Sequence, residues 1–168
     1  MSSAVISHDD LVAGLHARGV CYLAPTPAGD EPPLSDDALI LGLAKSRDGR
    51  LRFALAALLL RHPRFAGEVA RLAEAESHPK TRDELRKQYA AAMYLQRLWR
   101  TRLRLCLGAE GGSIPEKFTA EMKLPHADEM FGERGLRELC DRSPFNDWSS
   151  YEQVVAMLCD QPCPGATF

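Results

Sequence analysis

Apolar residues along most of this chain recur every three or four positions, which is the spacing of helices that bury one face. Leu11, Val12 and Leu15 form the first such face, in a helix that we predict over residues 7–18. Strict alternation of apolar and polar residues is absent, and we expect at most one short extended segment, near residues 20–23. The same spacing occurs in seven further segments, over residues 35–46, 51–61, 64–76, 81–107, 116–123 and 131–141 and from residue 149 onward. We expect a fold of about seven helices from these segments.

Two of these helices are expected to form the spine of the fold. Residues 51–61 are apolar around the whole circumference of the helix, which is typical of an element buried on every side. Residues 81–107 contain neither proline nor glycine, so the pattern predicts one continuous helix about 40 Å long. Ser7, Thr81 and Ser149 each stand three positions before an acidic residue and are predicted to begin helices through capping boxes.

Proline and glycine mark the expected boundaries of the chain. Four prolines fall within residues 24–33, so residues 1–34 are interpreted as a helix and a proline-rich linker, an appendage to the core. Residues 35–160 form the predicted helical core domain. Residues 161–168 contain two prolines and a glycine and are expected to be an irregular tail.

Composition agrees with an all-α class. The chain of 168 residues has 23 leucines and 22 alanines, against only 9 valines and isoleucines together. Leucine and alanine favour helices and β-branched residues favour strands, so a β-sandwich or barrel is excluded. We therefore predict a compact, bundle-like arrangement of helices.

Several features indicate a bacterial cytoplasmic protein. The longest apolar block, residues 53–60, is far shorter than the roughly 20 residues that cross a membrane, so no membrane association is expected. The beginning of the chain lacks the basic and apolar regions of a secretory signal. Five cysteines occur without a regular framework, which favours free thiols in a reducing compartment. Arginine outnumbers lysine by 16 to 5, which is typical of a GC-rich genome.

The formal charge of −2 conceals a segregation along the chain. Residues 1–79 carry a net charge of −2, residues 80–108 of +6 and residues 109–168 of −6. The near-neutral total argues against a uniformly basic nucleic-acid-binding protein. The basic segment coincides with the long predicted helix.

At 100° per residue, five arginines of that helix fall within an arc of about 60°. Tyr89 flanks this arginine stripe, where it could stack on a base. Guanidinium groups suit phosphate and carboxylate, so the stripe is a candidate anion- or partner-binding surface. The alternative, which we favour at this point, is that the arginines pair internally with the acidic residues of the segment 109–168. The candidate binding residues are Arg82, Arg86, Tyr89, Arg97, Arg100 and Arg104.

Other candidate sites are weaker. Arg71 and His78, separated by six residues, resemble the Arg–His pair of the all-helical HEPN ribonucleases and toxins and form an alternative catalytic pair. This resemblance covers two residues, which a chain with this many arginines is expected to contain by chance. His126 and Asp128 lack the spacing of a metal motif and are interpreted as part of a solvated loop. No cofactor motif occurs, and we expect neither a metal nor a cofactor.

Two functions from different classes remain open. The first is a non-enzymatic interaction or regulatory module that binds a protein partner or a second copy of itself. The alternative is a protein that binds RNA or a phosphate-bearing ligand, for example a HEPN-like ribonuclease or toxin, through the arginine stripe. A stripe that lies unpaired in a groove favours the alternative, whereas a stripe paired with the acidic segment favours the first.

Overall fold

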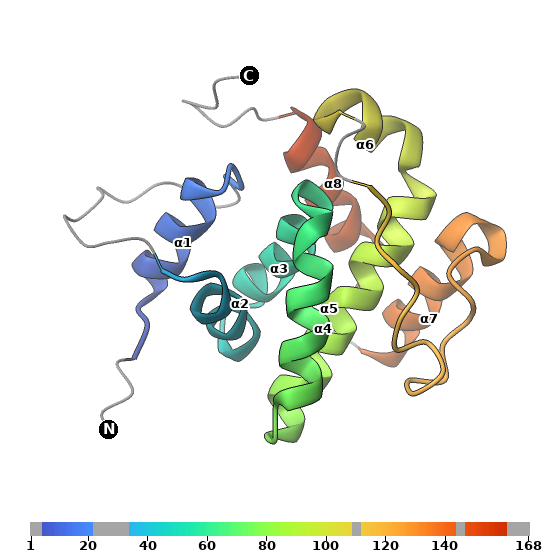
Figure 1. Cartoon of the computed structure of the whole chain (residues 1–168). Helices are drawn as coiled ribbons and strands as arrows, with labels where there is room; N and C mark the ends of the chain where they lie inside the picture. Colours follow the sequence, from blue (N-terminus) through green and yellow to red (C-terminus); the bar gives the residue numbers. More distant parts are fainter. Residues whose placement is uncertain (1–4, 22–33, 109–111, 144–146, 161–168) are drawn as a thin grey trace.

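Helices account for nearly all the regular structure of the protein. The computed structural model describes residues 5–21, 34–108, 112–143 and 147–160. Within these ranges there are eight α-helices, two short 3-10 helices and no strand, which confirms the all-α class (Figure 1). The elements are α1 (His8–Ala17), α2 (Asp36–Lys45), α3 (Gly49–Arg61), η1 (Pro63–Phe65), α4 (Ala66–Ala75), α5 (Pro79–Leu98), α6 (Arg100–Leu107), η2 (Glu129–Gly132), α7 (Glu133–Arg142) and α8 (Trp148–Asp160).

Helix α3 is the central helix, as its apolar circumference predicts. Every residue from Ala54 to Leu60 is at most 4% exposed. The helix packs against α1, α2, α5 and α8, so side chains that point in several directions all meet apolar neighbours. Burial on every side favours apolar side chains at every position of this stretch, and the sequence has leucine or alanine at each of them.

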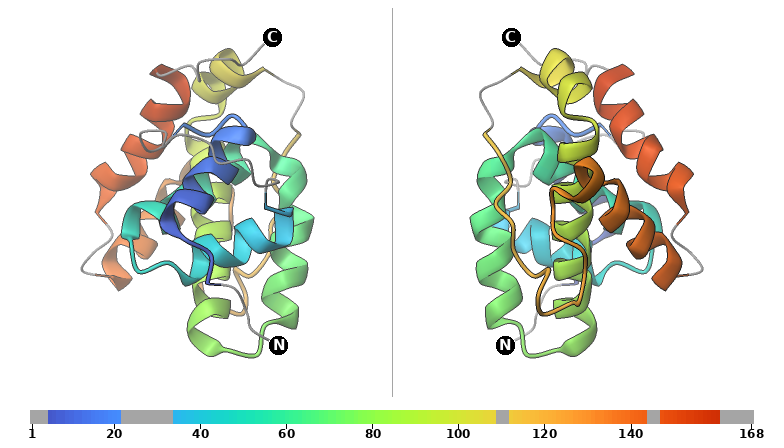
Figure 2. Two further views of the ribbon diagram at one scale, coloured as in Figure 1. Left: turned by 90° about the vertical axis from the view of Figure 1, so that its left-hand side faces the viewer. Right: turned by 90° about the vertical axis from the view of Figure 1, so that its right-hand side faces the viewer.

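Helix α5 lies beside α3 and forms the second half of the spine. Figure 2 shows it between α4 on one side and α7 and α8 on the other. Ala90, Ala91 and Ala92 are fully buried in its middle. Their small side chains allow neighbouring helices to approach the α5 backbone closely.

The prediction of one continuous helix over residues 81–107 is wrong. The chain leaves helical geometry at Trp99, with φ −105° and ψ 25°, and continues as the separate helix α6. The break turns α6 toward α8 and buries Leu103, which is 6% exposed. The change of direction therefore follows from packing, because neither proline nor glycine occurs there.

The segment between α6 and α7 also differs from the prediction. Residues 116–123 form turns rather than a helix, with φ 70° at Phe118 and 53° at Lys123. The Phe118 ring packs edge-on against the Tyr89 ring at a centroid distance of 5.2 Å. Aromatic burial against α5 thus takes the place of the predicted helical face.

The beginning of the described chain is tied to the helical core by hydrogen bonds. The Arg18 guanidinium donates to the carbonyl of Leu34 at 2.7 Å and to Asp36 at 2.9 Å. The His62 Nε2–H donates to the Arg18 carbonyl at 2.6 Å. The expected linker over 24–33 and tail over 161–168 lie outside the described residues.

The cysteines depart from the expectation of free thiols throughout. Cys21 is disulfide-bonded, whereas Cys106, Cys140 and Cys159 are free. Cys106 on α6 and Cys159 on α8 face each other within hydrogen-bonding reach. None of the helices in the described ranges has the length and apolar character needed to cross a membrane.

Candidate anion-binding pocket

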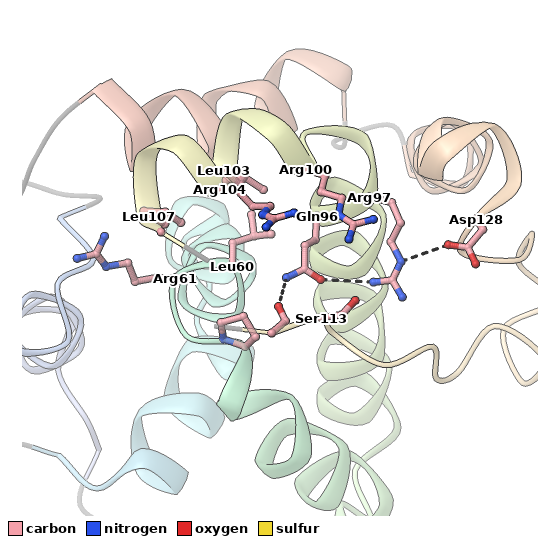
Figure 3. A pocket seen from close by; sticks show the side chains of 13 residues that line it. Leu60, Arg61, Gln96, Arg97, Arg100, Leu103, Arg104, Leu107, Ser113 and Asp128 are labelled. Carbon is pink, nitrogen blue, oxygen red and sulfur yellow. Dashed lines mark hydrogen bonds and ion pairs between the residues drawn. The ribbon is translucent and has the colours of Figure 1, made fainter. Parts of the chain in front are cut away.

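A pocket of about 530 Å³ opens where α6 leaves the line of α5 (Figure 3). The end of α3, the last turn of α5 and most of α6 form its walls, and the segment after Gly112 closes one side. The break at Trp99 turns α6 toward α8, so that α6 forms one wall of a hollow whose other walls include the end of α3 and the last turn of α5. The described lining residues are Leu60, Arg61, Pro63, Gln96, Arg97, Arg100, Leu103, Arg104, Leu107, Gly108, Gly112, Ser113 and Asp128.

Three members of the predicted arginine stripe meet in this pocket. Arg97, Arg100 and Arg104, which we call the arginine row, project into it from α5 and α6 along one side (Figure 3). Their spacing of three and four residues keeps them on one face across the break at Trp99. Arg100 and Arg104 are exposed to solvent and make no ion pair or hydrogen bond with any described residue.

Arg97 is the anchored member of the arginine row. Its side chain is 18% exposed, its Nη1 donates to the Ile114 carbonyl at 2.7 Å, and its Nε lies 3.6 Å from Asp128 Oδ1. These contacts fix the direction of the guanidinium group. They also place the only carboxylate of the described lining at one end of the pocket.

Gln96 binds the segment 112–114, which forms one wall of the pocket. Its Oε1 accepts a hydrogen bond from the Ile114 N–H at 2.7 Å, and its Nε2 donates to the Gly112 carbonyl at 3.0 Å. One side-chain amide therefore satisfies two backbone groups of a segment that has no regular secondary structure. Ile114 is fully buried beside this bridge and anchors the segment to the core.

The side of the pocket next to α3 is apolar. Leu60 and Pro63 lie there, and Leu103 and Leu107 of α6 extend the apolar surface between them and the arginine row. Arg61 stands apart, beyond Leu60, with its guanidinium directed away from the arginine row (Figure 3). The pocket thus has a cationic half and an apolar half.

The electrostatic balance of the described lining is strongly positive. Four arginines and one aspartate give a formal net charge of +3. The first turn of α6 contains no acidic residue, although Arg100 and Arg102 stand there. The beginning of a helix carries partial positive charge, so Arg100, which unlike Arg102 has no carboxylate partner among the described residues, lies where a cation is electrostatically unfavourable.

The remaining predicted stripe residues do not belong to this pocket. Arg82 and Arg86 are in the first turns of α5, where Arg82 lies 3.8 Å from Asp83 and Arg86 lies over the Phe118 ring. Tyr89 is 1% exposed, and its hydroxyl donates to the Pro115 carbonyl at 2.8 Å. The expectation that Tyr89 stacks on a base at the surface is therefore wrong.

The expected internal pairing with the segment 109–168 is found for only one member of the stripe. Among the described residues, Arg97 alone of the five meets a carboxylate of that segment, Asp128. Acidic residues of the segment pair mainly with nearby partners, as in Glu133–Arg137 and Glu138–Arg142. Local i,i+4 pairs satisfy these carboxylates without the arginine row.

The Arg71 and His78 pair is not assembled into a site. Arg71 binds Asp37 of α2 and Glu68, each at 2.8 Å, so carboxylates occupy its guanidinium. His78 is exposed at the beginning of α5, and neither residue lines the pocket. The structure gives no support to the two-residue resemblance to HEPN proteins.

Polar contacts hold the loop around His126, whose Nδ1 accepts a hydrogen bond from the Asp128 N–H at 3.2 Å. His126 Nε2 lies 2.6 Å from Glu116 Oε2, and its Nδ1 lies 3.8 Å from Asp128 Oδ2. No group of three metal-ligating side chains is found among the described residues.

Comparisons with known proteins do not identify the chain. No family model, curated protein or solved structure matches it. The assignment of function therefore depends on the pocket itself. The sequence prediction does not include the lining residues Arg61 and Gln96. Their places in the pocket depend on the fold, and no sequence pattern marks them.

Proposed function

We propose that this protein binds a small anionic ligand, one that carries phosphate or carboxylate groups, in the pocket between α3, α5 and α6. The observation that carries the proposal is the arginine row, which brings three guanidinium groups into one pocket with a single carboxylate among the described lining residues. Guanidinium groups present paired N–H donors that match the oxygens of phosphate and carboxylate.

The lack of internal partners supports a ligand-binding role over a structural one. A structural arginine is normally engaged by a carboxylate or by backbone carbonyls, as Arg18 and Arg142 are here. Arg100 and Arg104 have no such partner among the described residues. Keeping like charges together without compensation is unfavourable, and a bound anion would remove that cost.

Pyrophosphate is a suitable probe because its charged oxygens can reach several guanidinium groups at once. We expect calorimetric titration to detect binding, and we expect Arg100→Gln and Arg104→Gln each to weaken it by roughly tenfold. Arg102→Gln is the matched control, because Arg102 belongs to the same helix but pairs with Asp160 at 3.3 Å outside the pocket. Absence of binding, or an equal loss in the Arg102 variant, would contradict the proposal.

A second candidate function, self-association, is supported by Met130 and Phe131. Both have left-handed backbone conformations, with φ 50° and 57°, and their side chains are 63% and 79% exposed. Such conformations cost roughly 1–2 kcal/mol each in non-glycine residues, and adjacent exposed apolar side chains are typical of contact surfaces. We expect sedimentation to show a concentration-dependent dimer that the double variant Met130→Ser/Phe131→Ser loses. A monomer at every concentration would exclude this candidate.

A further inference from the structure

We infer that the ligand is an amphipathic phosphate monoester, with its phosphate on the arginine row and an apolar body against Leu60, Leu103 and Leu107. This inference rests on the proposed function and adds the chemical class of the ligand. It follows from the two-sided character of the pocket, in which cationic and apolar walls face the same space.

The cationic wall favours phosphate over carboxylate. The guanidinium groups of Arg97, Arg100 and Arg104 bring more N–H donors to one place than the two oxygens of a carboxylate can accept. A phosphate monoester offers three terminal oxygens and a charge of about −1.5 to −2 near neutral pH. It therefore accepts more of these donors than a carboxylate and offsets more of the positive charge of the arginine row.

The apolar wall indicates that the ligand is more than an inorganic anion. Leu103 and Leu107 lie one turn apart on α6 and both line the pocket, where Leu107 is partly buried and Leu103 is 6% exposed. Leu60 and Pro63 extend that surface from α3 and η1. A bound hydrocarbon body would displace water from this surface, which inorganic phosphate alone would leave wet.

The dimensions of the pocket favour a small molecule over a polynucleotide. A volume of about 530 Å³ is within the range of sites that enclose metabolite-sized ligands. A single-stranded nucleic acid needs a groove with repeated cationic contacts and exposed aromatic rings for stacking. Here Arg82 and Arg86 lie apart from the pocket, and Tyr89 is buried.

The test compares ligands that share a phosphate and differ in the apolar body. Calorimetric titration of the full chain with hexyl phosphate and with inorganic phosphate should give at least tenfold tighter binding of the ester, because several methylene groups leave water. Hexanoate, which has a similar apolar body and a carboxylate, should bind at least tenfold more weakly than hexyl phosphate. A short single-stranded RNA should bind no more tightly than inorganic phosphate.

Variants assign the two halves of the pocket separately. Leu107→Ser should reduce the preference for hexyl phosphate over inorganic phosphate by roughly three- to tenfold, because it removes part of the apolar wall. Far-UV circular dichroism of this variant checks that it is folded. Leu105→Ser is the matched control, since Leu105 lies on the same helix, is 83% exposed and does not line the pocket.

The outcomes separate this inference from the proposed function. Equal affinities for hexyl phosphate and inorganic phosphate would overturn the inference and leave the proposed anion binding in place. Tighter binding of hexanoate would also overturn it, as would a higher affinity for RNA with a steep dependence on salt. If none of the anions binds, the proposed function and the inference fail together.

Discussion

Among the described glycines, Gly135 has the least room for a side chain. A Cβ atom at this position would overlap the ring of Tyr94. That ring has no freedom to move away, because Tyr94 is fully buried and its hydroxyl donates to the Pro125 carbonyl at 2.6 Å. The glycine therefore sets the distance between α5 and α7.

Gly135→Ala is accordingly expected to destabilise the protein by roughly 1–3 kcal/mol through overpacking. Gly67→Ala is the matched control, since Gly67 is also helical and has open space around its Cα. There the loss of backbone freedom in the unfolded chain should raise stability by roughly 0.5–1 kcal/mol. Urea unfolding of both variants checks the prediction, and equal stabilities would contradict it.

His62 makes the stability of the protein depend on pH. Burial lowers the pKa of His62 below its ordinary value of 6.5, the charges of Arg64, Arg61 and Arg18 lower it further, and the hydrogen bond to the Arg18 carbonyl opposes them. The unfolded chain therefore binds a proton at a higher pH than the folded chain. The stabilisation that neutral His62 contributes is fully present above about pH 6.5. It is lost as the pH falls from there through the lowered pKa of His62.

The stability difference between the wild type and His62→Gln should therefore shrink as the pH falls from 7.5 to 5. Comparison of the two proteins cancels the contributions of the groups that both share. His78→Gln is the control, because it removes an exposed histidine and should leave the pH dependence that His62 produces in place. Denaturant unfolding at each pH provides the measurement, and a constant His62→Gln difference would refute the assignment.

At the scale of elements, Gln96 stabilises a segment that has no helix of its own. Gln96→Ala removes the acceptor for the buried Ile114 N–H and the donor for the Gly112 carbonyl. We expect a loss of roughly 1–3 kcal/mol and amide exchange at Ile114 that is at least tenfold faster. Gln153→Ala is the control, because Gln153 is exposed on α8. Unchanged exchange at Ile114 would show that the bridge is dispensable.

Helix boundaries were predictable where a local interaction determines them. The capping box of Ser7 and Asp10 forms as predicted, and Ser35 caps α2. The boxes expected at Thr81 and Ser149 do not begin helices, because α5 starts earlier at Pro79 and α8 at Trp148. The break at Trp99 carries no local signal, since it depends on the position of α8, far away in sequence.

At the scale of the whole molecule, we expect the charge of Arg100 in the arginine row to add nothing to the stability of the fold. Arg100 opens α6, so replacing its positive charge with a negative one removes repulsion and complements the helix dipole. Arg100→Glu should therefore leave the melting temperature at low salt unchanged or raise it by up to about 3 °C. Arg102→Glu should lower it, because Asp160 lies 3.3 Å away. A lower melting temperature for Arg100→Glu would indicate a structural role.

Part of the site could be recognised from the sequence, and part could not. Arg97, Arg100 and Arg104 share a helical face by spacing alone, and that relation survives the break at Trp99. The pocket itself depends on the break, which long-range packing produces. For Tyr89 the helical spacing is misleading. It places Tyr89 beside the arginines, but Phe118, 29 residues later in the chain, covers the Tyr89 ring.

The facing thiols of Cys106 and Cys159 offer a covalent reporter of helix motion. Burial and the hydrogen bond with Cys106 raise the pKa of Cys159 to about 12. Hydrogen peroxide converts two thiols to a disulfide and is itself reduced to two waters. Because the thiolate is the form that reacts, this cross-linking should accelerate as the pH rises. Because α6 carries Arg100, Arg104 and Cys106, a ligand that shifts this helix must change the cross-linking rate. An unchanged rate with pyrophosphate bound would mean that the arginine row is already in place before the ligand arrives.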